Sequence, residues 1–106
     1  MKILLDTADY YVIKELIESY PIVGITTNPT ILANECKYGG ESPAKVLIRL
    51  RCLIGHDKEL HVQLTETEYE RMIEEAYRIV KHLGDNTFIK VPMSEVGLKV
   101  IKKLSD

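Results

Sequence analysis

The sequence is poor in cysteine and lacks both a long apolar run and an excess of one charge. Its 14 basic and 16 acidic residues give a net charge of −2, which leaves no electrostatic footprint for nucleic acid or an anionic membrane. No apolar run approaches the length of a membrane-spanning helix, and the apolar start after Met1 is too short for a signal peptide. Cys36 and Cys52 have no disulfide spacing, so we expect free thiols in a cytoplasmic protein without nucleic-acid or membrane partners.

Motifs that bind cofactors are missing as well. The glycine pair Gly39-Gly40 is too short for a phosphate-binding loop or a dinucleotide fingerprint. The histidines His56, His61 and His82 are scattered over a loop, a strand and a helix, without the spacing of metal ligands. We therefore expect neither a cofactor nor a metal ion.

What the sequence does contain is a regular alternation of strand-like and helix-like patterns. The expected strands are residues 2–6, 23–27, 59–64 and 87–91. Helical apolar spacing follows each of them, at residues 10–20, at 43–54, after 65 and from about 94. Strands and helices in strict alternation predict a parallel α/β sheet, and 106 residues are enough for one core.

Local signals mark the starts of several helices. Asp9 is a suitable N-cap for the first helix, and Ser42, followed by a proline, suits the start of another. Asn28 and Pro29 predict a cap and only a short helical turn, followed by a loop over residues 35–41.

The long helix after the third strand has its own start signal. Thr65 and Glu68 stand three residues apart, which is the spacing of a capping box. Further along this helix, the charges of Glu74 and Glu75 read as a solvated surface.

Each expected strand has two faces, because side chains alternate along a strand. One face is wholly aliphatic, as expected for the side that helices cover. Its residues are Ile3, Leu5, Val23, Ile25, Leu60, Val62, Leu64, Ile89 and Val91. The other face becomes polar toward the carboxyl end of every strand, with Asp6, Thr26, Asn28, Gln63 and Lys90. Parallel α/β proteins place their sites at that end, so these residues are the candidate site.

Lys90 is unusual because it interrupts the apolar run Phe88-Ile89-Lys90-Val91 just before Pro92. Burying its ammonium group would be costly unless chemistry uses the neutral amine. On an edge strand, a lysine can instead extend to water or block edge pairing, and the run alone favours that interpretation. The face and edge that Lys90 shares with the other polar strand ends favour the functional interpretation.

The chemistry that this set could support is carbonyl chemistry. A neutral lysine attacks a ketone to form a carbinolamine and then an iminium, which draws electrons from a neighbouring C–C bond. Asp6 could exchange protons with substrate hydroxyls, and Thr26 and Asn28 could bind them. Gln63 does not titrate, so its useful role is to position a water or a hydroxyl.

These residues lie in motifs that resemble the transaldolase family. The motifs are Leu4-Leu5-Asp6-Thr7-Ala8, Gly24-Ile25-Thr26-Thr27-Asn28-Pro29-Thr30, Val62-Gln63 and Ile89-Lys90-Val91-Pro92, followed by Gly97-Leu98. The resemblance extends over essentially the whole chain. It is strongest to the small fructose-6-phosphate aldolases and their transaldolase-like relatives.

The resemblance implies a (β/α)₈ (TIM) barrel with Lys90 as the Schiff-base lysine on the fourth strand and Asp6 and Asn28 as substrate-orienting residues. Gln63 would stand where true transaldolases carry a catalytic-water carboxylate and the aldolase branch a glutamine. This favours a class I aldolase acting on fructose 6-phosphate or dihydroxyacetone-type ketoses. The alternative is a transaldolase that transfers a dihydroxyacetone unit between sugar phosphates, as in the pentose phosphate pathway.

A (β/α)₈ barrel needs eight units, and this sequence supplies four. We therefore expect residues 1–106 to be the N-terminal half of a single barrel domain in a longer protein. The family's phosphate-binding arginine and the C-terminal helix through which it forms homo-oligomers would lie beyond residue 106. Two other hypotheses stay open: a half-barrel that pairs with a second copy, and a fragment without activity of its own.

Overall fold

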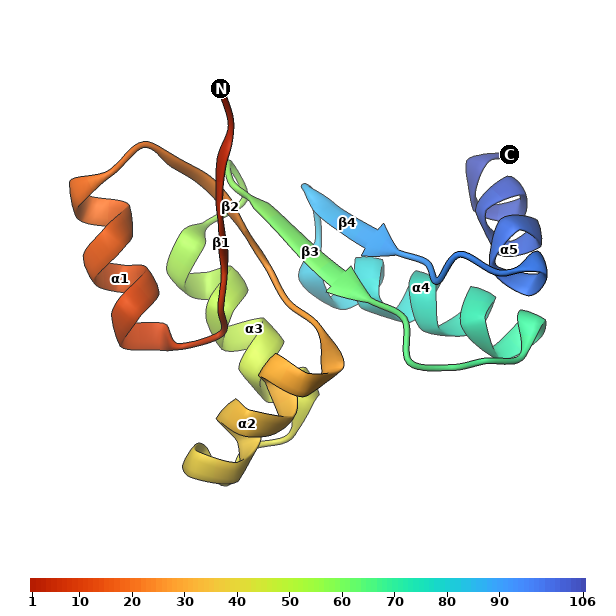
Figure 1. Ribbon diagram of the computed structural model, residues 1–106, viewed down its shortest axis with the longest axis horizontal. Coiled ribbons are helices and arrows are strands. Elements are labelled where there is room, and N and C mark those ends of the chain that lie inside the picture. The colour runs from red at the N-terminus through yellow and green to blue at the C-terminus, as the bar shows by residue number, and fades with distance from the viewer.

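Four strands form one parallel sheet in the computed structural model, which describes residues 1–106 (Figure 1). The strands are β1 (Ile3–Asp6), β2 (Ile22–Thr26), β3 (Glu59–Gln63) and β4 (Thr87–Lys90). Their spatial order is β1-β2-β3-β4, and each strand pairs in parallel with the next one in the chain. The predicted parallel α/β sheet is confirmed, and this order fits half of a (β/α)₈ barrel.

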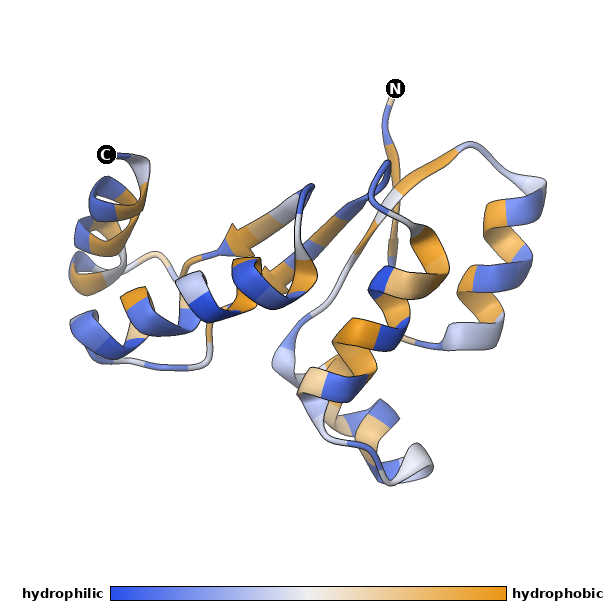
Figure 2. Cartoon of the chain, turned by 180° about the vertical axis from the view of Figure 1, so that it is seen from behind, coloured by the Kyte–Doolittle hydropathy of each residue, from blue (hydrophilic) through white to orange (hydrophobic).

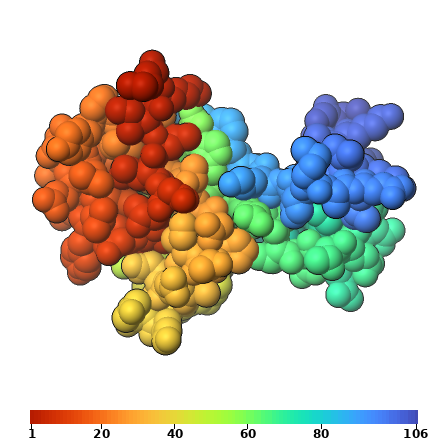
Figure 3. Space-filling model, in the orientation of Figure 1, coloured from red at the N-terminus to blue at the C-terminus, as the bar shows by residue number.

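Five helices accompany the strands: four lie in the connections between strands, and the fifth follows β4. They are α1 (Tyr10–Ser19), α2 (Pro29–Gly39), α3 (Pro43–Ile54), α4 (Tyr69–Leu83) and α5 (Glu95–Ser105). The strands pass in front of α3 and α4 in Figure 1 and behind them in Figure 2, so these helices lie on one side of the sheet. The molecule measures 40 × 34 × 22 Å, and the strands reach its surface on the face seen in Figure 3.

Three helices begin at the caps that the sequence predicts. Asp9 Oδ1 accepts hydrogen bonds from the backbone N–H groups at the start of α1, at 3.1 and 3.2 Å. Asn28 Oδ1 does the same for α2 at 2.9 Å, and Ser42 Oγ for α3 at 3.3 Å. These bonds satisfy N–H groups that have no partner inside the helix.

Three local predictions are wrong. The short turn expected after Asn28 is a full helix of 11 residues, and it continues through most of the expected loop. The capping box expected at Thr65 does not form, because α4 begins only at Tyr69 and its N-cap, Glu68, makes no side-chain cap bond. The chain between β3 and α4 is instead held by Glu75, which is buried rather than solvated.

The core lies between the aliphatic face of the sheet and the helices. Its main cluster consists of Ala8, Ile13, Ile25, Leu32, Val46, Leu47, Leu50, Ile54, Leu60, Val62 and Leu83. A smaller cluster under the end of β3 consists of Leu64, Met72, Ala76 and Val100. On the opposite face of the sheet, Leu4 and Phe88 are exposed, which confirms the predicted division of the strands into a covered and an uncovered side.

The structure also bears on the apolar content of the helices and on the two cysteines. None of the five helices combines the length and the apolar character needed to cross a membrane. Cys36 is half-buried and Cys52 is exposed, and both are free thiols, as their spacing predicts.

Arg51 joins the loops at the amino end of the sheet, a contact that the sequence pattern did not reveal. Its buried guanidinium donates to the carbonyl oxygens of Leu83, Gly55, Lys58 and Asn86 at 2.8–2.9 Å, and to Thr87 Oγ1 at 3.0 Å. Burial lowers the pKa of Arg51 below its ordinary value, and the charge of Asp85 opposes this shift. One side chain therefore fixes the segments that lead into β3 and β4.

We expect Arg51→Met to lower the free energy of unfolding by about 3 kcal/mol or more, because several buried carbonyl groups lose their donors together. Urea unfolding monitored by circular dichroism measures the change. Lys45→Met, at an exposed position of the same helix, should change this free energy by less than about 0.5 kcal/mol. Equal stabilities of the two variants would contradict the structural role of Arg51.

Candidate functional site

The five candidate residues lie at the carboxyl ends of the strands, on the face that the helices leave open. The register pairs Asp6 with Thr26 and Gln63 with Lys90 on neighbouring strands. Asn28 lies two residues beyond the end of β2, where it is the N-cap of α2. We call this set of five residues the polar rim.

Asp6 and Thr26 are joined directly across β1 and β2. Thr26 Oγ1 donates a hydrogen bond of 2.7 Å to Asp6 Oδ1. The Asp6 side chain is exposed, and its second carboxylate oxygen has no protein donor. The carboxylate is thus oriented on one side and open on the other.

Asn28 has one half of its amide committed to the fold. Its Oδ1 accepts the N–H of Ile31 at 2.9 Å as the cap of α2. The Nδ2 group makes no hydrogen bond within the protein, so both of its N–H donors are free to bind a ligand.

Lys90 ends β4, and its side chain is exposed. The burial that its apolar run suggested is therefore not found, because no helix or loop of this chain covers the rim side of β4. Its position is nevertheless fixed through the backbone, since the carbonyl oxygen of Lys90 accepts the N–H of Leu64 at 3.0 Å. This bond extends the pairing of β3 with β4 past Gln63.

Thr27 is a rim support that the sequence analysis missed. It is 2% exposed, and both its backbone N–H and its hydroxyl donate to the carbonyl oxygen of His61, at 3.0 and 2.8 Å. These two bonds lock the end of β2 against β3. The Thr-Thr pair in the sequence was a visible signal, but its second member lies on the covered face.

A second row of side chains lies on the open face below the rim. Glu59 accepts a hydrogen bond from Lys2 Nζ at 2.9 Å, and its other oxygen lies 2.9 Å from His61 Nε2. The ring of His61 stacks on Phe88, with centroids 4.8 Å apart and planes at 11°. Opposite Glu59, a Cβ on Gly24 would clash with the Glu59 carbonyl oxygen, so the close approach of β2 and β3 requires glycine there.

The pKa of Glu59 lies below its ordinary value of 4.5, first because of the hydrogen bond from Lys2 and then because of the one from His61. A carboxyl group whose pKa is lowered by folding stabilises the folded state above its unfolded pKa. This contribution is lost as the pH falls through the lower, folded value.

We expect the stability difference between the unmutated chain and Glu59→Gln to be largest near neutral pH and to shrink as the pH falls below 4.5. Thermal unfolding of both proteins in a pH series measures it. Glu18→Gln, at an exposed position of α1, is the control for loss of a carboxylate and should change the stability by less than about 0.5 kcal/mol. A constant difference for Glu59→Gln would contradict the assigned ion pairs.

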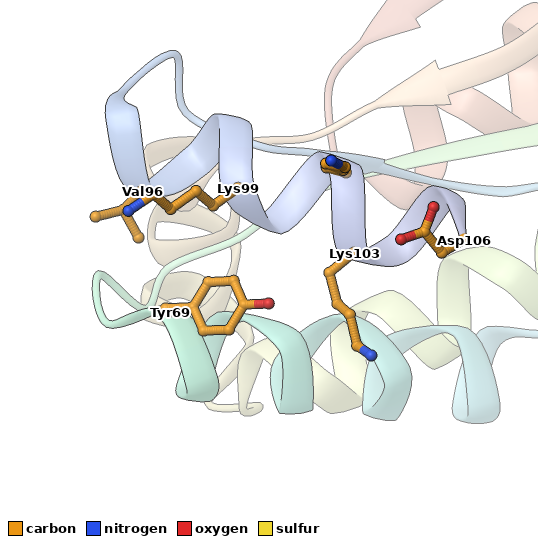
Figure 4. A pocket seen from close by; sticks show the side chains of 6 residues that line it. Tyr69, Val96, Lys99, Lys103 and Asp106 are labelled. Carbon is orange, nitrogen blue, oxygen red and sulfur yellow. The ribbon is translucent and has the colours of Figure 1, made fainter.

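Two surface pockets lie near the carboxyl ends of the strands. One, of about 260 Å³, is lined by Asp6, Asp9, Asn34, Glu35 and four neighbours, and it opens between α2 and the start of α1. The other, of about 470 Å³, lies between α4 and α5, with Tyr69 facing a side of α5 that carries Lys99 and Lys103 (Figure 4). The first adjoins the rim through Asp6, whereas the second contains no rim residue.

The rim groups together can act on a carbonyl compound that carries hydroxyl groups. Lys90 supplies an amine, Asp6 an oriented carboxylate, and Asn28 an amide donor. Gln63 lies opposite Lys90 and can both donate and accept a hydrogen bond. No group of three or more His, Cys, Asp or Glu side chains is arranged to hold a metal ion.

Comparison with known proteins shows what this chain resembles. A family model described as transaldolase/fructose-6-phosphate aldolase matches residues 3–106. A probable transaldolase of Thermoplasma volcanium is 40% identical over 105 residues, covering 99% of this chain and 45% of the relative. A probable fructose-6-phosphate aldolase of Streptococcus pneumoniae is 36% identical over 104 residues, covering 98% of this chain and 46% of the relative. The chain thus spans slightly less than half the length of these curated relatives.

Proposed function

The chain belongs to the transaldolase/fructose-6-phosphate aldolase family, and we propose that it carries the imine-forming part of a class I aldolase site for fructose 6-phosphate or dihydroxyacetone-type ketoses. The observation that carries this proposal is the pairing of Gln63 with Lys90 at the polar rim, beside the bonded pair of Asp6 and Thr26. An amine, a carboxylate and neutral hydrogen-bonding groups at the carboxyl end of one sheet suit imine chemistry on a polyhydroxy ketone.

In the proposed reaction, Lys90 Nζ attacks the C2 carbonyl of the ketose once it has lost its ammonium proton. The new C–N bond gives a carbinolamine, which loses water to form an iminium. The C4 hydroxyl then gives up its proton, the C3–C4 bond breaks, and its electron pair moves into the iminium to form an enamine. For fructose 6-phosphate, the released aldehyde is glyceraldehyde 3-phosphate.

The second half of the reaction frees the lysine. The enamine takes up a proton at C3, water adds to the restored iminium, and dihydroxyacetone leaves as the C–N bond breaks. Asp6 is the proposed proton acceptor for the C4 hydroxyl, directly or through a water that Gln63 holds. Asn28 and Thr26 are the proposed hydroxyl-binding groups, and the free amide N–H of Asn28 supports this role.

The decisive experiment is trapping of the imine. Incubating the chain with dihydroxyacetone and sodium borohydride should add one reduced dihydroxyacetone unit at Lys90, detected by intact mass and peptide mapping. Lys90→Met should abolish the adduct, whereas Lys99→Met, at an exposed position of α5, should keep it. A folded, concentrated sample without an adduct at Lys90 would rule out imine chemistry for this chain.

A transaldolase activity is the second candidate, because several of the curated relatives are named probable transaldolases. Transfer uses the same enamine, which attacks an acceptor aldehyde instead of taking up a proton. The neutral side chain of Gln63 favours cleavage, since the resemblance implies that true transaldolases carry a carboxylate at that position.

Product analysis separates the two activities. With fructose 6-phosphate alone, we expect free dihydroxyacetone to appear, and an added aldose phosphate should not consume it. Gln63→Glu should move the products toward transfer, because it places a carboxylate beside Lys90. Release of dihydroxyacetone only when an acceptor is absent, with transfer whenever one is present, would favour the transaldolase.

A further inference from the structure

The buried carboxylate of Glu75 accepts several hydrogen bonds from the loop that follows β3. The residue lies in the middle of α4 and is 7% exposed. Its two oxygens accept from the N–H of Thr65 at 2.9 and 3.1 Å, from Thr65 Oγ1 at 2.6 Å and from the N–H of Glu66 at 3.1 Å. Bonds of this kind, with an ionised acceptor, are among the stronger hydrogen bonds in proteins.

This arrangement is not a helix cap. The helix α4 starts at Tyr69, six residues before Glu75, so the carboxylate serves donors outside its own helix. The loop turns back so that Thr65 and Glu66 meet the side of α4. Without Glu75, two backbone N–H groups in a partly buried loop would lose their acceptor.

The bonds of Glu75 lead directly to the polar rim. Thr65 is two residues after Gln63, and the residue between them, Leu64, donates its N–H to the carbonyl oxygen of Lys90 at 3.0 Å. The Leu64 side chain is 2% exposed, which anchors this point from the covered side. A single path of bonded residues therefore connects Glu75 with both members of the Gln63–Lys90 pair.

We propose that Glu75 is a positioning residue that holds Gln63 opposite Lys90 by fixing the backbone from Leu64 to Glu66. The inference rests on the proposed function, because it gives the position of Gln63 a catalytic consequence. Gln63 can hold a water or a hydroxyl at the lysine adduct only if the end of β3 keeps its place, and misplacement by about 1 Å can reduce a rate about a hundredfold.

Hydrogen exchange tests the structural part in the chain as it stands. Glu75→Gln replaces an accepting oxygen with an NH₂ group, and Glu74→Gln is the matched change at the neighbouring exposed position. We expect Glu75→Gln to reduce the protection of the Leu64 amide about tenfold or more. Glu74→Gln should leave it unchanged, and Ile25 in β2 should stay protected in both. Equal protection of Leu64 in the two variants would overturn the proposal.

A second variant covers the case in which Glu75→Gln does not fold. Thr65→Val keeps the shape of the side chain and removes only the hydroxyl donor at 2.6 Å from Glu75. It should reduce the protection of Leu64 in the same direction but by a smaller factor. Unchanged protection in a folded Thr65→Val protein would also count against the proposal.

Kinetics test the catalytic part. Glu75→Gln should lower kcat for fructose 6-phosphate cleavage by about ten- to a hundredfold with little change in KM. Added to Gln63→Ala, it should cause no further loss, because both changes remove the same interaction. Additive losses would overturn the positioning role. If the unmutated chain forms no Lys90 adduct, the proposed function fails instead. The protection of the Leu64 amide then still tests whether Glu75 fixes the backbone from Leu64 to Glu66.

Discussion

Parallel pairing of the four strands is the constraint on which the rest of this structure depends. It brings every strand's carboxyl end to the same edge, so residues up to 84 positions apart, such as Asp6 and Lys90, share one rim. Connections between parallel strands must cross over the sheet, and here each contains at least one helix on the covered side. The site chemistry and the core are therefore separated onto the two faces of the same strands.

The two ends of the sheet differ in how their side chains are bonded. At the amino end, Arg51 binds four carbonyl groups and holds the segments before β3 and β4. At the carboxyl end, Thr27 and Glu75 fix the backbone, whereas the rim side chains of Asp6 and Lys90 stay exposed. Groups that are fully bonded thus support the fold, and groups with free donors or acceptors face outward at the rim.

The open face gives the rim its chemical setting. Below the rim, Glu59 joins Lys2 and His61, and His61 stacks on Phe88, so charged and aromatic groups line the uncovered side. The side chains on this face are not packed beneath a helix, and Leu4 and Phe88 are exposed there. Lys90 is exposed at the end of β4 for the same reason.

The sequence by itself determined the strands, their alternation with helices and the caps at Asp9, Asn28 and Ser42. These features depend on residues close together in the chain, and the period-two pattern also predicted which side chains share the rim. Only the tertiary structure decided the partners of Arg51, Glu75 and Thr27. Glu75 was predicted to be a solvated surface residue, and no role was predicted for Arg51 or Thr27, because their hydrogen-bond partners lie up to about 36 residues away in the chain. A local pattern fixes the direction of a side chain, but the group that it meets is set by how the units pack.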